Sequence, residues 1–267
     1  MWEKTGVRDR HDRPIHTRQS QEGGITGLAA LDRVAAIDWP AIDWPAIVAD
    51  LDAQGWAVVP DLLAESQCDS TADLYEADAG FRSRIVMAQH GFGQGEYRYF
   101  AYPLPPLIQQ LRTSIYPYLA PIANRWHERM RIATRFPATH ADFLDRCHCA
   151  GQARPTPLLL RYGAGDYNCL HQDLYGEHVF PLQVAILLSE PARDFKGGEF
   201  VLTEQRPRRQ TRPAVVLLTK GDAVIFAVNR RPVRGSRGDY RVVLRHGVSQ
   251  IRGGRRYALG VIFHDAA

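Results

Sequence analysis

The sequence has few cysteines and no long apolar run. Its 267 residues include only four cysteines, Cys68, Cys147, Cys149 and Cys169, which are too few and too scattered for a disulfide framework. No stretch approaches the roughly 18 consecutive apolar residues of a membrane span. The charged start, MWEKTGVRDRHDRP, also lacks the apolar segment of a secretory signal. We therefore expect a protein of a reducing compartment, located in the cytoplasm.

Charge is distributed unevenly along the chain. The composition, 45% apolar and 23% charged, is that of an ordinary globular protein, and the net charge is +4. Between residues 201 and 256, however, 13 Arg and one Lys face only Glu204, Asp222 and Asp239, a local excess of eleven positive charges. Such a segment indicates an anionic partner, although arginines on solvent-exposed strand faces are the alternative.

The first half of the chain predicts a flexible arm and then helices. Residues 1–25 are polar and unpatterned, which is typical of a flexible arm. In the tandem AIDWPAIDWPAI, the Asp-Trp-Pro pieces suit helix starts. A helix ending near Gly55, a strand WAVV and a helix over 65–79 are expected next. We interpret 26–150 as a mostly helical support region.

One long apolar pattern within this support carries two prolines. Apolar residues recur at steps of three and four between residues 104 and 134, which predicts one or two helices. Pro117 and Pro121 are expected to kink or divide them. The segment 91–106, GFGQGEYRYFAYPLPP, is rich in glycine and tyrosine and is expected to be a loop.

After residue 155 the pattern changes to short β-rich runs. These runs are PLLLRY, VFPLQVAILL, GEFVLTE, AVVLLT, DAVIFA, YRVVLRHGV and RYALGVIF. Short strands with turn residues between them, and no helical periods, predict an antiparallel sandwich or barrel over 151–267. The fold class is therefore α+β, a helical N-terminal support packed on a β-barrel.

Three polar residues of the β-rich part have the types of a metal site. His171 and Asp173 in NCLHQD are two apart, so a strand would present both on one face. His246 in VVLRHGV supplies a third ligand from another apolar strand. Two imidazoles and one carboxylate leave coordination positions open, as non-haem Fe(II) oxygenases require. His178 is expected beside the ligands or at the cavity rim, and the role of the Cys147-His148-Cys149 segment stays open.

An arginine follows the distal histidine at a fixed spacing. Arg256 comes ten residues after His246, on an alternating strand that is expected to run into the barrel. A buried guanidinium needs a partner, and a carboxylate matches it with two parallel hydrogen bonds. The alternatives are that Arg255 points inward or that both arginines face solvent.

The motifs RYGAGDYNCLHQD, GGEF, GDAVIF, RHGV and GGRRYAL, in this order over residues 156–264, resemble those of the 2-oxoglutarate- and Fe(II)-dependent oxygenases. The resemblance implies a double-stranded β-helix (jelly roll), with His171, Asp173 and His246 as iron ligands. It also implies that Arg256 binds the distal carboxylate of 2-oxoglutarate, assisted by Tyr162 or Tyr167. Such enzymes use O2 to convert 2-oxoglutarate to succinate while they hydroxylate a substrate, with ascorbate as a possible reductant.

Two branches of this superfamily share the motifs. LLRYGAGDYNCLHQD is similar to the NRYxxGxxLxxHxD segment of AlkB-like nucleic-acid dealkylases, but Leu160 stands where that family has a cosubstrate-binding Asn. The C-terminal Arg-x-Asn-x-x-x-x-x-Arg pattern of AlkB-like proteins is also absent. GGEF and HGVSQIRGGRRYAL instead resemble the prolyl-hydroxylase branch, in which one basic residue ten after the distal His grips the cosubstrate.

Other segments favour nucleic acid. HGFGQGEYRYF and HQDLYGEHVFPLQ resemble a bacterial oxygenase family described as acting oxidatively on damaged, methylated DNA. Arg230, Arg231 and Arg234, expected at the barrel mouth, could neutralise phosphates, and the segment Tyr97, Arg98 and Tyr99 could contact an extruded base.

The leading hypothesis is therefore a dioxygenase that demethylates alkylated DNA. One alternative is a prolyl-hydroxylase-like protein or small-molecule hydroxylase. The other is a non-enzymatic jelly-roll module that keeps the metal for structure or sensing.

Overall fold

The computed structural model describes residues 37–77 and 79–267, and the predicted flexible arm over 1–25 lies outside the described residues. The α-helices are α2 (Trp44–Gln54), α3 (Glu65–Asp73), α4 (Pro106–Arg129) and α5 (His140–Cys149), with short 3-10 turns η2 (Trp39–Ala41), η3 (Leu74–Glu76) and η4 (Met87–His90). In the two described ranges no helix is both long enough and apolar enough to cross a membrane.

The N-terminal strands are β1 (Trp56–Val59), β2 (Phe81–Val86), β3 (Gly93–Gln94) and β4 (Glu96–Phe100). The later ones are β5 (Leu158–Tyr162), β6 (Tyr167–His171), β7 (Leu182–Leu187), β8 (Phe195–Gly197), β9 (Phe200–Gln205), β10 (Arg212–Val216), β11 (Ala223–Ala227), β12 (Arg230–Gly235), β13 (Gly238–Val248), β14 (Ile251–Gly254) and β15 (Arg256–Val261). Each predicted β-rich run overlaps one of these later strands, so the antiparallel β-rich part is confirmed.

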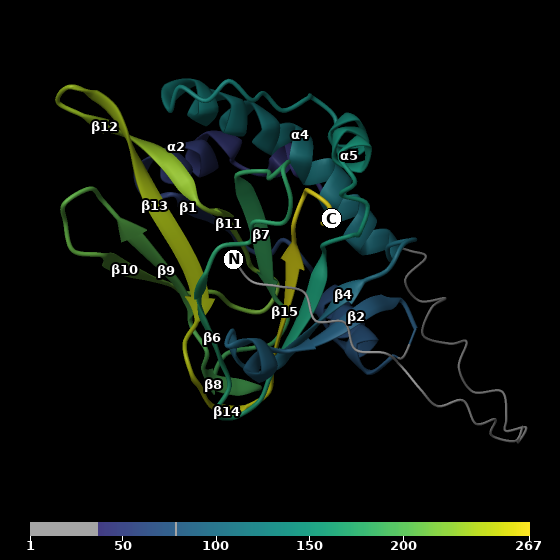
Figure 1. Cartoon of the computed structure of the whole chain (residues 1–267). Helices are drawn as coiled ribbons and strands as arrows, with labels where there is room; N and C mark the ends of the chain where they lie inside the picture. Colours follow the sequence, from purple (N-terminus) through teal and green to yellow (C-terminus); the bar gives the residue numbers. More distant parts are fainter. Residues whose placement is uncertain (1–36, 78) are drawn as a thin grey trace, which may run out of the picture.

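The strands form two antiparallel sheets with helices on one side (Figure 1). The seven-stranded sheet has the order β1-β11-β7-β15-β5-β4-β2. The second sheet has the order β10-β9-β13-β6-β3, with β12 also paired to β13, and β14 pairs with β8 separately. Helices α2, α4 and α5 lie together at the top of the view, beside the seven-stranded sheet (Figure 1).

Alternation along the central strands gives the seven-stranded sheet two different faces. Leu159, Ile186, Ile225 and Leu259 belong to the large core that the helices share. Their chain neighbours point to the opposite face and line a cavity between the sheets. These cavity residues are Leu158, Leu160, Ala185, Phe226, Ala258 and Gly260.

The helices show where sequence signals were sufficient. Helix α2 begins after Asp43, whose carboxylate accepts a hydrogen bond from the Ala46 N–H at 3.0 Å, and it ends at Gly55 with φ 88°. These are the predicted cap and stop. The predicted helix over 65–79 is shorter, because α3 ends at Asp73 and a 3-10 turn follows.

The prolines of α4 do not divide it. Pro117 and Pro121 lie inside one 24-residue helix, so the expected pattern forms one helix and not two. Both prolines are on the exposed side, where water can bind the carbonyl groups that lose a backbone donor. The opposite face buries residues such as Leu111 and Trp126, and this packing holds the helix together.

The N-terminal support is less helical than the sequence predicted. Residues 26–150 also supply β1, β2 and β4 to the seven-stranded sheet and β3 to the other sheet. The segment 91–106, predicted as a loop, contains β3 and β4, and β4 pairs with β5 through Tyr97↔Leu160. Pairing across about sixty residues leaves no local signal, so residue 150 marks no structural boundary.

Candidate metal centre and cosubstrate pocket

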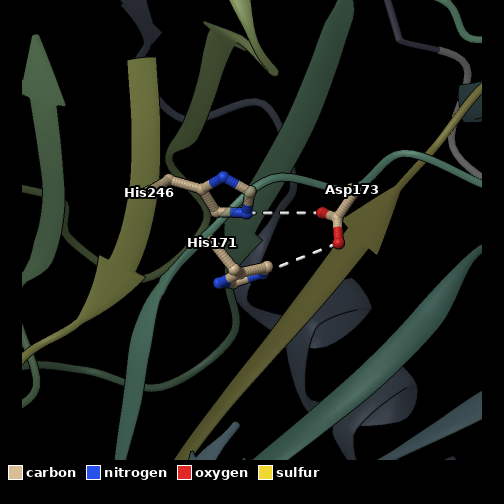
Figure 2. A group of neighbouring side chains, drawn as sticks. All are labelled: His171, Asp173 and His246. Carbon is tan, nitrogen blue, oxygen red and sulfur yellow. Dashed lines mark ion pairs between the residues drawn. The ribbon is translucent and has the colours of Figure 1, made fainter. Parts of the chain in front are cut away.

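His171, Asp173 and His246 meet between the two sheets. His171 ends β6 and lies directly opposite His246 of β13 in the sheet register. His246 Nε2 is 3.3 Å from Asp173 Oδ2, and His171 Nε2 is 3.6 Å from Asp173 Oδ1. Figure 2 shows both imidazoles directed toward the Asp173 carboxylate. One potential ligand atom from each residue lies within 4.8 Å of the others.

Asp173 reaches this cluster from a segment that is not part of a strand. Strand β6 ends at His171, so the two ligands do not share one strand as the sequence predicted. The Asp173 carboxylate is instead fixed by the Tyr175 hydroxyl, which donates to Oδ1 at 2.8 Å. The Tyr99 hydroxyl donates in turn to the Tyr175 oxygen at 3.1 Å. These tyrosines orient the carboxylate from outside the ligand group.

The protonation states suit metal binding. Burial raises the pKa of Asp173, but the hydrogen bond and charge of His246, with the charge of His171, lower it overall to well below its usual range. Burial lowers the pKa of His246 and favours the neutral imidazole. His171 Nδ1 lies 2.8 Å from the Cys169 carbonyl oxygen, which can only accept, so Nε2 is left free to coordinate.

The donor set therefore fits a ferrous ion. A metal ligand must be a neutral imidazole or an ionised carboxylate, and the lowered pKa values of His246 and Asp173 favour these forms. Two nitrogens and one oxygen from one side leave positions for other ligands, the arrangement that non-haem Fe(II) oxygenases use. Across the described ranges, this is the one group of three or more His, Cys, Asp or Glu side chains close enough to hold an ion. The Cys147-His148-Cys149 segment thus forms no second centre there; His148 Nε2 is 2.8 Å from Asp265 Oδ2 instead.

A cavity of about 190 Å³, the metal-site cavity, adjoins the three residues. Its floor is formed by small residues of the seven-stranded sheet, Ala185, Ala258 and Gly260. A Cβ at Gly260 would lie 2.6 Å from Leu158 Cδ2, so glycine lets the Leu158 side chain pack closely against the floor. The cavity is therefore built into the register of the sheet.

Arg256 lies in the wall of this cavity with unsatisfied donors. It is only 3% exposed, and its Nε and Nη1 are buried with no hydrogen-bond partner among the described residues. Burial lowers the pKa of Arg256 below its usual value. A carboxylate supplies the acceptors and the charge that such a guanidinium lacks. Arg255 is exposed, so the alternative in which Arg255 points inward is wrong.

Of the two candidate tyrosines, the cavity contains Tyr162. Tyr162 is fully buried, lies opposite Arg256 in the register, and its ring centroid is 5.6 Å from the Arg256 guanidinium carbon. Its hydroxyl accepts a long hydrogen bond of 3.4 Å from Asn168. Tyr167 is 37% exposed and does not line the cavity. His178 is outside the ligand group, and its backbone N–H donates to the Gln152 side chain.

Tyr97 and Tyr99 lie on the same face of β4, with their ring centroids 5.3 Å apart, and Arg98 lies on the other face. Tyr97 lines the metal-site cavity. Tyr99, 8% exposed, binds Tyr175 and so supports Asp173 indirectly. Arg98 does not line the cavity, and its guanidinium carbon is 4.9 Å from the Tyr75 ring centroid, so the predicted contact of Arg98 with a substrate base is not made from inside the cavity.

The Arg231 side chain is buried and does not lie on the surface where it could bind phosphate. It is 1% exposed, pairs with the buried Glu204, and donates to the Asp52 carbonyl oxygen at 2.9 Å. The prediction that Arg231 touches substrate is wrong, because packing of β12 against α2 turns its side chain inward. Position within an arginine-rich segment did not reveal this.

Arg230 and Arg234 are exposed, but the hairpin that carries them extends away from the metal. Gly238 begins β13 eight residues before His246, which corresponds to about 26 Å along the strand. The β12–β13 turn and β14 lie at opposite ends of the view (Figure 1). The expected position of these arginines at the barrel mouth is therefore corrected, and Arg230, at the base of the hairpin, is nearer the metal than Arg234.

Gln183 is a cavity residue that sequence reasoning missed. It is 4% exposed and lines the metal-site cavity, and its Oε1 is buried without a partner among the described residues. It lies opposite Phe226, whose ring centroid is 4.6 Å from that of His246. A single Gln within the apolar run PLQVAILL was the available signal.

Comparisons with known proteins point to the same chemistry as this geometry. A family model described as "Oxygenase, catalysing oxidative methylation of damaged DNA" matches residues 95–266. Two uncharacterized proteins of Mycobacterium tuberculosis, MT2286 and Rv2227, are each 51% identical over 168 residues, which is 63% of this chain and 72% of each relative.

Solved structures share the fold at low identity. A Pseudomonas putida prolyl-4-hydroxylase aligns with a TM-score of 0.51 and 15% identity, over 84% of this chain and all of that chain. An oxidoreductase of the 2OG-Fe(II) oxygenase family from Burkholderia pseudomallei aligns with a TM-score of 0.51 and 16% identity, over 84% and 93% of the two chains.

The family match covers well over half of the chain and includes His171, Asp173, His246 and Arg256. The fold and the cluster of potential ligands agree with it. The chain belongs to this oxygenase family, within the superfamily of 2-oxoglutarate- and Fe(II)-dependent dioxygenases.

Proposed function

We propose that this dioxygenase hydroxylates methyl groups on alkylated bases of DNA and thereby demethylates them. The observation that carries the chemistry is the metal-site cavity, in which the His171, Asp173 and His246 cluster lies with the unpaired Arg256. The family description supports damaged DNA as the substrate class. We further propose that the two sheets form a double-stranded β-helix.

Each residue of the cavity then has a role. His171, Asp173 and His246 hold Fe(II), which supplies the activation of O2 when bound. Arg256 binds the distal carboxylate of 2-oxoglutarate, and the Tyr162 hydroxyl lies beside it. One O2 is consumed; one oxygen atom enters succinate as CO2 leaves, and the other enters a C–H bond of the substrate. A hydroxymethyl group on a base nitrogen then leaves as formaldehyde.

The nucleic-acid hypothesis uses arginines outside the cavity. Phosphate contacts position a strand and make binding salt-dependent. Gln172, the neighbour of Asp173 in the chain, donates a hydrogen bond to the Asn229 side chain. Arg230 follows Asn229 directly, so its backbone lies close to the metal-binding segment. The exposed arginines of the β9–β10 and β12–β13 hairpins are Arg208, Arg209, Arg212, Arg230, Arg234, Arg237, Arg241 and Arg245.

A specific observation favours a second candidate, a prolyl-hydroxylase-like protein or small-molecule hydroxylase. Phe92 lines the cavity and is 47% exposed, and Leu170 and Leu174, on either side of the ligand segment, are 47% and 44% exposed. Exposed apolar side chains of this kind suit an apolar peptide or small molecule rather than phosphates.

The test is coupled turnover with the reconstituted enzyme. Protein loaded with Fe(II), 2-oxoglutarate and ascorbate is mixed with a methylated single-stranded oligonucleotide, the same oligonucleotide without methyl groups, or proline-containing peptides. We expect succinate and formaldehyde in equal amounts with the methylated oligonucleotide only, and neither from His171→Ala.

The DNA contacts are tested separately. Arg230→Ser/Arg234→Ser should weaken oligonucleotide binding and reduce the slope of log K against log salt by about 1 to 2, whereas the exposed Arg193→Ser should not. Succinate release that responds to peptides but not to methylated DNA would assign the enzyme to the second candidate.

A further inference from the structure

A second cavity of about 390 Å³, the rear cavity, lies next to the metal-site cavity. It is formed by β8, the end of β10 and the segment that follows β7. Arg256 and Phe200 line both cavities. These two side chains therefore form the partition between the metal and the rear cavity.

Arg256 faces one aromatic wall in each cavity. Its guanidinium carbon is 5.6 Å from the ring centroid of Tyr162, which lines the metal-site cavity, and 5.8 Å from that of Phe195, which lines the rear cavity. No hydrogen bond among the described residues fixes its Nε or Nη1. A Cβ at Gly198 would lie 3.0 Å from Arg256 Cδ, so glycine at the partition leaves room for the arginine stem.

The rear cavity carries positive charge at its solvent side. Lys196 and Arg252 line it and are exposed. Glu199 is the one acidic residue of the lining, and it is already engaged by the Ser249 hydroxyl and, at 3.5 Å, by Arg252. With Arg256 the lining therefore has a net positive charge, which attracts a dianion and raises its local concentration.

We propose that 2-oxoglutarate enters, and succinate leaves, through the rear cavity, separately from the opening that admits the primary substrate. The inference rests on the dioxygenase chemistry and not on DNA as the substrate. Phe92 lines the metal-site cavity and is 47% exposed, so the cavity meets solvent there and a bound macromolecule would cover this opening. A path behind Arg256 lets the cosubstrate exchange while this opening is covered.

The experiment measures how fast 2-oxoglutarate binds and leaves Fe(II)-loaded protein without O2, by stopped-flow absorbance. Leu217→Trp places an indole at the edge of the rear cavity; Leu217 is 80% exposed, so the change leaves the core intact. An obstacle on a path used for both entry and exit slows both steps by the same factor. We expect association and dissociation rate constants to fall together, several-fold, with an unchanged Kd.

A second experiment tests the positive charge of the rear cavity. Arg252→Glu should slow association several-fold at low salt and less at high salt, because steering of ions is screened. Arg255→Glu, the same charge change at an exposed neighbour that does not line the cavity, should leave the rate unchanged.

Unchanged rate constants in Leu217→Trp, or a weaker Kd with unchanged association, would overturn the route. Failure of methylated DNA to stimulate turnover would leave these rates unaffected. Failure of the loaded wild-type protein to bind 2-oxoglutarate would instead contradict the dioxygenase chemistry itself.

Discussion

Arg112 and Arg256 are both buried, in different surroundings. Arg112 donates to the Ile262 carbonyl oxygen at 2.8 Å, to the Tyr102 hydroxyl at 2.9 Å and to Asp265 Oδ1 at 2.6 Å. Arg256 has two nitrogens buried with no partner among the described residues. One guanidinium is therefore complete within the fold, and the other lacks acceptors that a ligand can supply.

The comparison separates structural from functional charges. Burial of an unpaired charge costs several kcal/mol, so folded proteins pair such groups unless a ligand completes them. Exposure alone does not distinguish the two arginines, which are 0% and 3% exposed. The hydrogen-bond partners do, and they assign Arg112 to the stability of the fold and Arg256 to the site.

The largest effect on the free energy of unfolding is expected at the buried ion pair of Arg112 and Asp265. Asp265→Ala leaves the Arg112 charge buried without its carboxylate and should lower the free energy of unfolding by about 3–5 kcal/mol. Urea denaturation of the metal-free protein measures this. Arg193→Ala, at an exposed ion pair, is the matched control and should leave the urea midpoint almost unchanged. A fall no larger than that of the control would mean that Arg112 finds other acceptors and that the two arginines are alike.

Arg256→Met should produce the opposite pattern. The free energy of unfolding should stay the same or rise slightly, because Arg256 Nε and Nη1 have no hydrogen-bond partner among the described residues that the substitution could remove. Binding of 2-oxoglutarate should become weaker by about 2 kcal/mol or more, because a buried charge pair with the ligand is lost. Calorimetry with Fe(II)-loaded protein under anaerobic conditions tests binding. Strong destabilisation with unchanged affinity would show that Arg256, too, is a structural residue.

A third effect is a pH dependence near Arg112. Burial first, then the charge of Arg112, lowers the pKa of His140 from 6.5 to about 3 and that of His264 to about 4. Both are neutral when folded but take up protons near pH 6.5 when unfolded. Their stabilisation is complete above pH 6.5 and is lost as the pH falls toward 4, by up to about 1.4 kcal/mol per pH unit for each group.

Urea midpoints of the metal-free protein between pH 7 and 5 measure this slope. His140→Gln, which keeps an N–H for the Phe263 carbonyl oxygen that His140 Nε2 contacts, should flatten it. Equal slopes in the two proteins would exclude His140 as a source.

Prediction from sequence succeeded where the signal was local. Asp43 and Gly55 marked the ends of α2, and the β-rich runs after residue 155 matched strands. Joint occurrence of spaced motifs predicted His171, Asp173, His246 and Arg256, which the structure places around one cavity. Their roles as ligands and cosubstrate contact remain proposals for the tests above.

Prediction failed where a side chain depends on distant partners. Arg230 and Arg231 are neighbours in one basic segment, yet one is exposed and the other pairs with Glu204. Neighbouring strand residues point to opposite faces, and only the neighbours of those faces decide which one is buried. The strands of residues 81–100 were missed for a similar reason, because β4 finds its partner β5 about sixty residues away.

The sequence by itself determined the chemical types and order of the site residues, since ligand spacing and alternation are local properties of the chain. Only the tertiary structure decided which of Tyr162 and Tyr167 lies beside Arg256, and that Tyr175 supports Asp173. It also decided that two cavities meet at Arg256. These features depend on the register between strands that are far apart in the chain, which local sequence patterns do not contain.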